Sequence, residues 1–143
     1  MYIFGKESKA VLQSVHPLLR LLAHKAILKH DFAVREGYRA EQAQHKAFLD
    51  KRSKVDWPNS KHNKFPSHAV HFLPIVNGRM IVDVATTIDI AQWSYFLGIV
   101  HALADDLRIP VRFGINWDMD AEILSDQTFN DWAHIELTGG ELI

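Results

Sequence analysis

Histidines near the middle and the end of the chain are the residues best suited to chemistry. The sequence contains nine histidines and no cysteine, so a transition-metal site must use imidazole or carboxylate ligands. His62, His68 and His71 surround an irregular segment and the strand expected after it, and His134 opens the last expected strand. A catalytic zinc site needs about three protein ligands and an open position for water. If the segment folds back, His62, His71 and His134 supply such a set. Asp131, three residues before His134, is close enough to act as a general base.

Other interpretations of these residues stay open on spacing alone. A histidine-rich loop also occurs in proteins that bind no metal. His68 competes with His71 for the second ligand position, although a loop position near the cleft is the commoner case. Asp118, Asp120 and Glu122 crowd one short segment and could bind calcium, but the spacing lacks the EF-hand glycine and terminal glutamate. A solvated acidic loop is the commoner explanation of such a cluster.

The elements that must position these residues follow from the hydrophobic spacing. Helical spacing covers residues 7–29, with a break or a new first turn at Pro17, and residues 41–50 and 86–107. Strands are expected at residues 31–36, 69–76, 80–84, 111–113 and 133–137, and loops at 51–67 and 114–130. Helices and strands segregate, so we expect an α+β fold with a small, mostly antiparallel sheet, N-terminal helices and a long core helix.

Composition excludes several classes of protein. The chain has 143 residues, 48% of them hydrophobic, and a net charge of −1, which fits a single domain over residues 1–143 and argues against disorder and a nucleic-acid partner. No apolar run is long enough for membrane insertion, and no signal peptide opens the chain, so we expect synthesis in a cytoplasm. Basic residues gather in the first half, where they could face an anionic partner or only solvent.

Short motifs of this chain resemble a known family. The segments are Ser60-Lys61-His62-Asn63, Pro66-Ser67-His68-Ala69-Val70-His71-Phe72-Leu73-Pro74 and Trp132-Ala133-His134-Ile135-Glu136-Leu137. They resemble the two metal-binding signatures of the VanY-type peptidoglycan peptidases, and within that group the phage endolysins that are L-alanyl-D-glutamate endopeptidases. Flanking residues follow the same order: Phe4-Gly5-Lys6, Arg35-Glu36-Gly37-Tyr38-Arg39 with Gln42, Asn77-Gly78-Arg79 and Arg112-Phe113-Gly114-Ile115-Asn116-Trp117. The resemblance covers essentially the whole chain.

The resemblance implies a role for each matching residue. His62, the residue at position 71 and His134 match the three zinc ligands. Asp131 matches the catalytic carboxylate, which takes a proton from water and passes it to the leaving amine. Arg39 matches the arginine that polarises the scissile carbonyl or holds a substrate carboxylate.

The resemblance departs from the family pattern at position 71. The family places an aspartate ligand there, whereas this chain has His71. Imidazole also binds zinc, so a three-histidine site is chemically sound, although losing a negative ligand lowers the pKa of the bound water and weakens the nucleophile. Either the chain is a natural variant with altered activity, or the site is impaired and the domain only binds peptidoglycan.

The function implied by the resemblance is zinc-dependent hydrolysis of the L-alanyl-D-glutamate bond in the cell-wall stem peptide, leading to host lysis. We expect a monomer that collects in the host cytoplasm and reaches the wall after membrane permeabilisation. Ser60 is expected to bond substrate or a ligand, and Trp132, with Trp117, to line the substrate groove. A metal nuclease is an alternative that rests only on the pair His62-Asn63.

Overall fold

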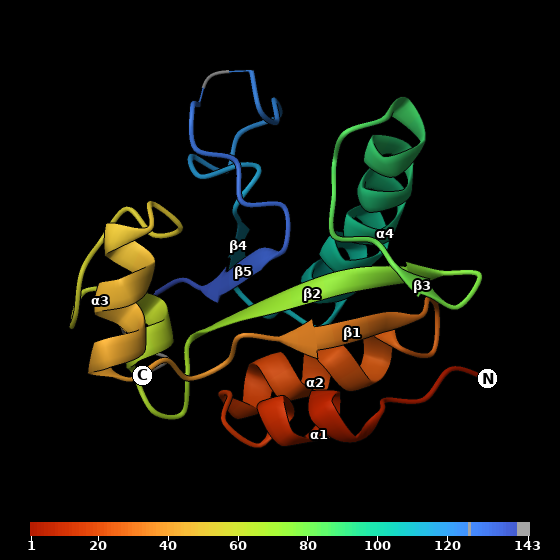
Figure 1. Cartoon of the computed structure of the whole chain (residues 1–143). Coiled ribbons are helices and arrows are strands. Elements are labelled where there is room, and N and C mark those ends of the chain that lie inside the picture. The colour runs from red at the N-terminus through yellow and green to blue at the C-terminus, as the bar shows by residue number, and fades with distance from the viewer. Residues whose placement is uncertain (126, 140–143) are drawn as a thin grey trace.

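Short helices, a small sheet and one long helix make up the described chain (Figure 1). The computed structural model describes residues 1–125 and 127–139. The helices are α1 (Lys6–Leu12), α2 (Pro17–Ala26), α3 (Glu41–Leu49), the 3-10 helix η1 (Lys61–Asn63) and α4 (Thr87–Asp106). The strands are β1 (Phe32–Arg35), β2 (Ala69–Val76), β3 (Arg79–Met80), β4 (Val111–Phe113) and β5 (His134–Leu137). The predicted α+β fold is confirmed.

His16 and Pro17 separate the first two helices, as the sequence predicts. Pro17 occupies the first turn of α2, where the missing N–H would have no partner within the helix. Nδ1 of His16 accepts a hydrogen bond from the backbone N–H of Leu18 at 3.1 Å and so caps the new helix. Leu19 and Leu22 are fully buried, and α2 packs against α4.

The sheet separates the core from a second face. Its order is β1-β2-β5-β4 with every neighbour antiparallel, and β3 pairs with the end of β2. Successive side chains on a strand point to opposite faces. Val70, Phe72 and Ile135 are fully buried in the core. His71 and His134 alternate with them along the strands and therefore point to the other face of the sheet, away from the core.

Helix α4 closes the core, as predicted. Trp93, Phe96 and Val100 follow helical spacing and are at most 1% exposed. Oγ1 of Thr86 accepts a hydrogen bond from the backbone N–H of Asp89 at 3.0 Å, which caps the first turn. In the described chain no helix, α4 included, is long and apolar enough to cross a membrane.

The strand expected at residues 80–84 is wrong beyond its first residue. β3 contains only Arg79–Met80. Ile81 still donates its N–H to the carbonyl of Pro74 at 2.9 Å and is buried, but Val82 and Val84 are exposed. The alternation of branched side chains resembles a strand, yet no neighbouring strand pairs with this segment. A second difference is η1, which lies inside the expected loop 51–67.

We predict that Phe72→Ala lowers the free energy of unfolding by about 3–5 kcal/mol, because it leaves a cavity in the core beside Phe32. Urea denaturation followed by circular dichroism measures the change. Phe65→Ala is the matched control, since Phe65 is 70% exposed and its loss should change the free energy by less than about 0.5 kcal/mol. Equal losses in the two variants would contradict this assignment of the core.

Candidate active site

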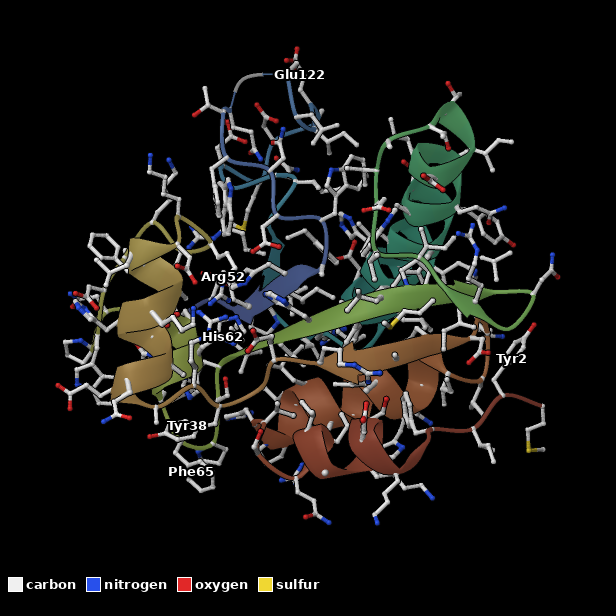
Figure 2. All side chains as sticks on the ribbon, viewed as in Figure 1. Tyr2, Tyr38, Arg52, His62, Phe65 and Glu122 are labelled. Carbon is white, nitrogen blue, oxygen red and sulfur yellow. The ribbon has the colours of Figure 1, made fainter. Side chains whose placement is uncertain are left out.

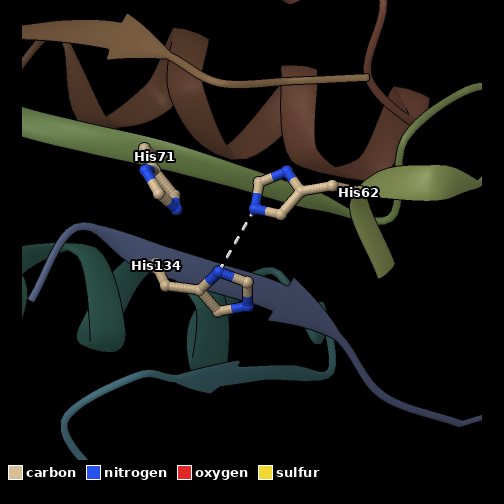
Figure 3. Close-up of side chains that lie close together, drawn as sticks. All are labelled: His62, His71 and His134. Atoms are coloured by element: carbon tan, nitrogen blue, oxygen red, sulfur yellow. Dashed lines mark hydrogen bonds between the residues drawn. The ribbon is translucent and has the colours of Figure 1, made fainter. Parts of the chain in front are cut away.

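Three histidines from distant parts of the chain converge on one point (Figure 3). His62 comes from η1, His71 from β2 and His134 from β5. One ring nitrogen of each lies within 4.8 Å of the others. The three rings are mutually edge-on, with centroids 5.0 to 5.5 Å apart. The group that the sequence singled out is therefore brought together.

Backbone geometry explains why these rings meet. His71 and His134 are directly opposite in the antiparallel pair of β2 and β5, so their side chains leave the sheet side by side. His62 is set by the cap of η1. Oγ of Ser60 accepts a hydrogen bond from the backbone N–H of His62 at 3.1 Å, and Oδ1 of Asn63 accepts one from the N–H of Ser60 at 3.0 Å. Ser60 thus holds the backbone of a cluster histidine.

The outer hydrogen bonds determine which ring nitrogens carry protons. Nδ1 of His62 lies 2.8 Å from the carbonyl oxygen of Gly37, which can only accept, so Nδ1 must donate. Nε2 of His134 lies 2.8 Å from Oε1 of Glu136, and it donates to that carboxylate for the same reason. In the neutral rings, Nε2 of His62 and Nδ1 of His134 then carry lone pairs, which face each other at 3.3 Å.

Two facing lone pairs repel each other unless a proton or a metal ion lies between them, and the surroundings of these histidines disfavour the proton. Burial, with the positive fields of His134 and Arg39, lowers the pKa of His62 to about 3. Burial also lowers the pKa of His71 well below its ordinary value, and its buried Nε2 has no hydrogen-bond partner among the described residues. The spacing of 3.3 Å between His62 and His134 matches the edge of about 3.3 Å expected for a tetrahedral ion with nitrogen ligands. The three histidines therefore fit a metal ion.

Asp131 lies beside the cluster. Its Oδ2 is 3.7 Å from Nε2 of His71 and 4.0 Å from Nδ1 of His134. Burial raises the pKa of Asp131, which suits a carboxylate that must take up and release a proton. Three backbone hydrogen bonds clamp Asp131 to Gly114. The N–H of Asp131 donates to the carbonyl of Gly114, the N–H of Gly114 to the carbonyl of His134, and the N–H of His134 to the carbonyl of Asp131. A Cβ at position 114 would lie 2.2 Å from the carbonyl oxygen of Asp131, so only glycine allows this approach.

Arg39 reaches the same region and is held there by Gln44. Nη1 of Arg39 donates to Oε1 of Gln44 at 2.9 Å, and the backbone N–H of Arg39 donates to the carbonyl of His62 at 2.8 Å. Gln44 is fully buried in α3, and its Nε2 donates to Oγ of Ser53 and to the carbonyl of Val55. A single amide side chain ties together α3, the Arg39 segment and the connection after α3.

A cavity of about 400 Å³ opens over the histidines, and it also contains Arg39, Ser60 and Asp131. One wall is aromatic. The rings of Trp117 and Phe129 stack with centroids 6.2 Å apart, and Nε1 of Trp117 donates to the carbonyl of Phe129 at 2.7 Å. Trp132 is not among the described residues that line the cavity. The centroid of its ring lies 6.3 Å from that of Trp93, a core residue.

The remaining sequence candidates lie elsewhere. His68 is buried outside the cluster, with its ring edge-on to His16 at 5.3 Å. Asp118 and Asp120 accept hydrogen bonds from backbone N–H groups of their own loop. Among the described residues, the three histidines are the only group of possible ligand side chains close enough to hold a metal ion, so the calcium alternative gains no support.

Sequence reasoning missed two residues that support the site. The carbonyl of Gly37 orients His62, and a Cβ at position 37 would lie 2.3 Å from Oγ of Ser14. The second residue is Gln44, whose side chain connects α3 with the Arg39 segment and with the connection after α3. No sequence signal marks Gln44, because its burial beside Ala47 in α3, which requires its polar atoms to be hydrogen-bonded, is seen only in the fold.

Comparison with known proteins agrees with this geometry. The crystal structure of the Serratia marcescens L-Ala D-Glu endopeptidase ChiX superimposes with a TM-score of 0.72 over 95% of this chain and 90% of that chain, at 22% sequence identity, which shows a shared fold. No match was found among curated protein sequences. The sequence model of the phage L-alanyl-D-glutamate peptidases matches residues 1–138. The chain therefore belongs to the phage L-alanyl-D-glutamate peptidase family.

Proposed function

We propose that this peptidase is zinc-dependent and that His62, His71 and His134 are its metal ligands. As a member of its family, it hydrolyses the L-alanyl-D-glutamate bond of peptidoglycan. The observation that carries the zinc assignment is the set of three imidazoles, each with one ring nitrogen within 4.8 Å of those of the others, whose outer nitrogens in His62 and His134 are paired with acceptors. Neutral imidazole is a preferred ligand of zinc, and a three-histidine set leaves a position open for catalysis.

The mechanism divides the chemistry between the metal and the protein. Zinc held by the three histidines supplies Lewis-acid activation of water and of the scissile carbonyl. Asp131 takes the proton from the attacking water at Oδ2 and delivers it to the leaving amine nitrogen, a cycle favoured by its raised pKa. Arg39, buried beside the cluster, donates a hydrogen bond to the carbonyl oxygen as negative charge develops there.

His71 serves this site as a ligand in place of the aspartate that the family pattern carries. Its side chain is only 17% exposed, and in the described part of the chain its Nε2 has no hydrogen-bond partner, although a buried polar atom normally has one. A ligand role accounts for that atom. His62, His71 and His134 would hold the metal ion without adding a negative charge, and the carboxylates of Asp131 beside His71 and Glu136 beside His134 would offset its positive charge.

The oligomeric state, the location and the substrate contacts of the enzyme are part of the same proposal. One copy of the chain already combines the three histidines, Arg39 and Asp131 around the cavity, and we propose that the enzyme acts as a monomer. Proteins of a phage family are made by the infected cell, and we propose that this enzyme collects in the host cytoplasm and reaches peptidoglycan once the membrane has been permeabilised. Ser60 and Trp132 stay proposed substrate contacts, with Trp117 as the aromatic residue that lines the cavity itself.

We predict that His71→Ala weakens zinc binding at least about 100-fold, since even loss of a supporting outer residue costs about 10–100-fold. Elemental analysis of the folded protein after dialysis against buffered zinc gives the zinc content. The unmodified protein should contain about one zinc ion per chain. His71→Asp should keep the zinc, because it supplies the carboxylate ligand. His24→Ala, an exposed histidine far from the cluster in sequence, is the control. Zinc retained equally by His71→Ala and His24→Ala would remove His71 from the ligand set.

Asp131→Asn should lower kcat/KM on purified peptidoglycan by about 10²–10⁴-fold while zinc stays bound, because the amide cannot carry the transferred proton. Release of free amines measures the rate. Asp118→Asn, in the exposed acidic loop, is the control with the same chemical change. Unchanged cleavage by Asp131→Asn would show that another group moves the proton.

Glu136→Gln should weaken zinc binding about 10-fold or more, because the carboxylate orients His134 and makes it a better ligand. Burial works to raise the pKa of Glu136, but hydrogen bonds from His134 and Arg112 outweigh burial and keep the carboxyl ionised. Competition with a chromogenic chelator measures the affinity, and Glu122→Gln is the exposed control. An unchanged affinity would reduce Glu136 to an ion-pair partner of Arg112.

A further inference from the structure

Positive charge exceeds negative charge in the cavity. The described charged residues of its lining are Arg39, Arg52, Lys54, Lys61, Arg112, Asp131 and Glu136. Five cations thus face two carboxylates, and the proposed metal ion would add to the imbalance. Such a cavity attracts an anionic group of the substrate.

Three of the five cations are already engaged. Nη2 of Arg112 pairs with Oε2 of Glu136 at 2.6 Å. Nζ of Lys61 donates to the backbone carbonyl at the end of β5 at 3.0 Å. Arg39 is buried and fixed by the amide of Gln44. Arg52 and Lys54, both on the connection that follows α3, are left.

Arg52 has only long contacts to carboxylates, and each of these carboxylates is held more closely by another cation. Its Nη1 is 3.9 Å from Oε1 of Glu36, which lies 3.6 Å from Arg39. Its Nη2 is 3.5 Å from Oδ2 of Asp50, which lies 2.9 Å from Lys46. The side chain is 51% exposed, so its planar fork is open to a further carboxylate.

Lys54 has no carboxylate within 4.0 Å among the described residues, and its Nζ lies 5.4 Å from the centre of the Phe129 ring on the cavity wall. Ser53, between the two cations, is anchored inward: its Oγ accepts a hydrogen bond from Gln44, and its backbone N–H donates to the carbonyl of Ala47. The neighbours Arg52 and Lys54 both reach the cavity. Figure 2 shows Arg52 and His62 one above the other beside α3.

We propose that Arg52 and Lys54 form a carboxylate-binding pair that recognises the free carboxylate of the D-glutamyl residue on the leaving side of the scissile bond. The inference rests on the proposed function and extends it to substrate recognition. A glutamyl residue within a linear peptide uses one carboxyl group to continue the chain and keeps the other free. That free group belongs to the residue that contains the scissile nitrogen, so it must enter the cavity with the reacting bond. A guanidinium fork and an ammonium group are complementary to it.

The test compares two peptides that differ only at the free carboxylate. L-alanyl-γ-D-glutamyl-L-lysine and its α-carboxamide are offered to the zinc-loaded enzyme for kcat/KM and, in parallel, to the zinc-free protein for calorimetric binding. The unmodified protein should favour the acid over the amide by about 10-fold or more in both measurements. In the double variant Arg52→Gln/Lys54→Gln the ratio should fall to about one.

Lys51→Gln/Lys64→Gln is the matched control, because it removes two exposed positive charges that do not line the cavity. It should keep the ratio of the unmodified protein. An acid preference that survives in Arg52→Gln/Lys54→Gln, or that is lost equally in the control, overturns the inference while cleavage stands. If the zinc-loaded protein cleaves neither peptide, the proposed activity fails. An acid preference in binding that only Arg52→Gln/Lys54→Gln abolishes would still support the pair.

Discussion

The antiparallel pairing of β2 with β5 is the constraint on which the site depends. It places His71 opposite His134 on one face and packs Val70, Phe72 and Ile135 into the core on the other. Slipping the register by one residue would exchange the two faces. Each of these apolar side chains contributes about 1.5–3 kcal/mol by burial, so the core that stabilises the fold also sets the distance between two imidazoles.

The hydrogen bonds behind the rings determine which ring nitrogen of His62 and of His134 faces the centre of the cluster. The carbonyl of Gly37 accepts a hydrogen bond from the Nδ1–H of His62, and the carboxylate of Glu136 accepts one from the Nε2–H of His134, so in the neutral rings the lone pairs lie on the inner nitrogens. Packing alone would bring the rings together without fixing which nitrogen faces inward. The acceptors behind the rings therefore distinguish a metal-binding cluster from a group of aromatic side chains in contact.

Much of this arrangement follows from the sequence. Helical and alternating spacing predicts the principal elements, and the motifs around His62, His71 and His134 predict the cluster. What could not be predicted is set by tertiary context. Gln44 sits in a helix with little apolar patterning, and its role depends on three segments that meet only in the fold. The false strand after β3 follows the correct alternation, but strand formation also needs a neighbour. Trp132 and Trp117 carry the same local signal, and only the fold shows that Trp117 lines the cavity while the ring of Trp132 lies 6.3 Å from that of Trp93.

The clamp between Gly114 and Asp131 separates the base of the loop between them from its tip. Hydrogen bonds close the base of this loop beside His134, so Asp131, the proposed catalytic carboxylate, is positioned by the base and not by the tip. Because the entropy cost of closing a loop rises only slowly with its length, insertions at the exposed tip around Asp118 and Asp120 should cost little. Such insertions leave the clamp in place as long as position 114 stays glycine, whereas a change at Trp117 reaches the histidine cluster, because its ring lies 5.3 Å from that of His134.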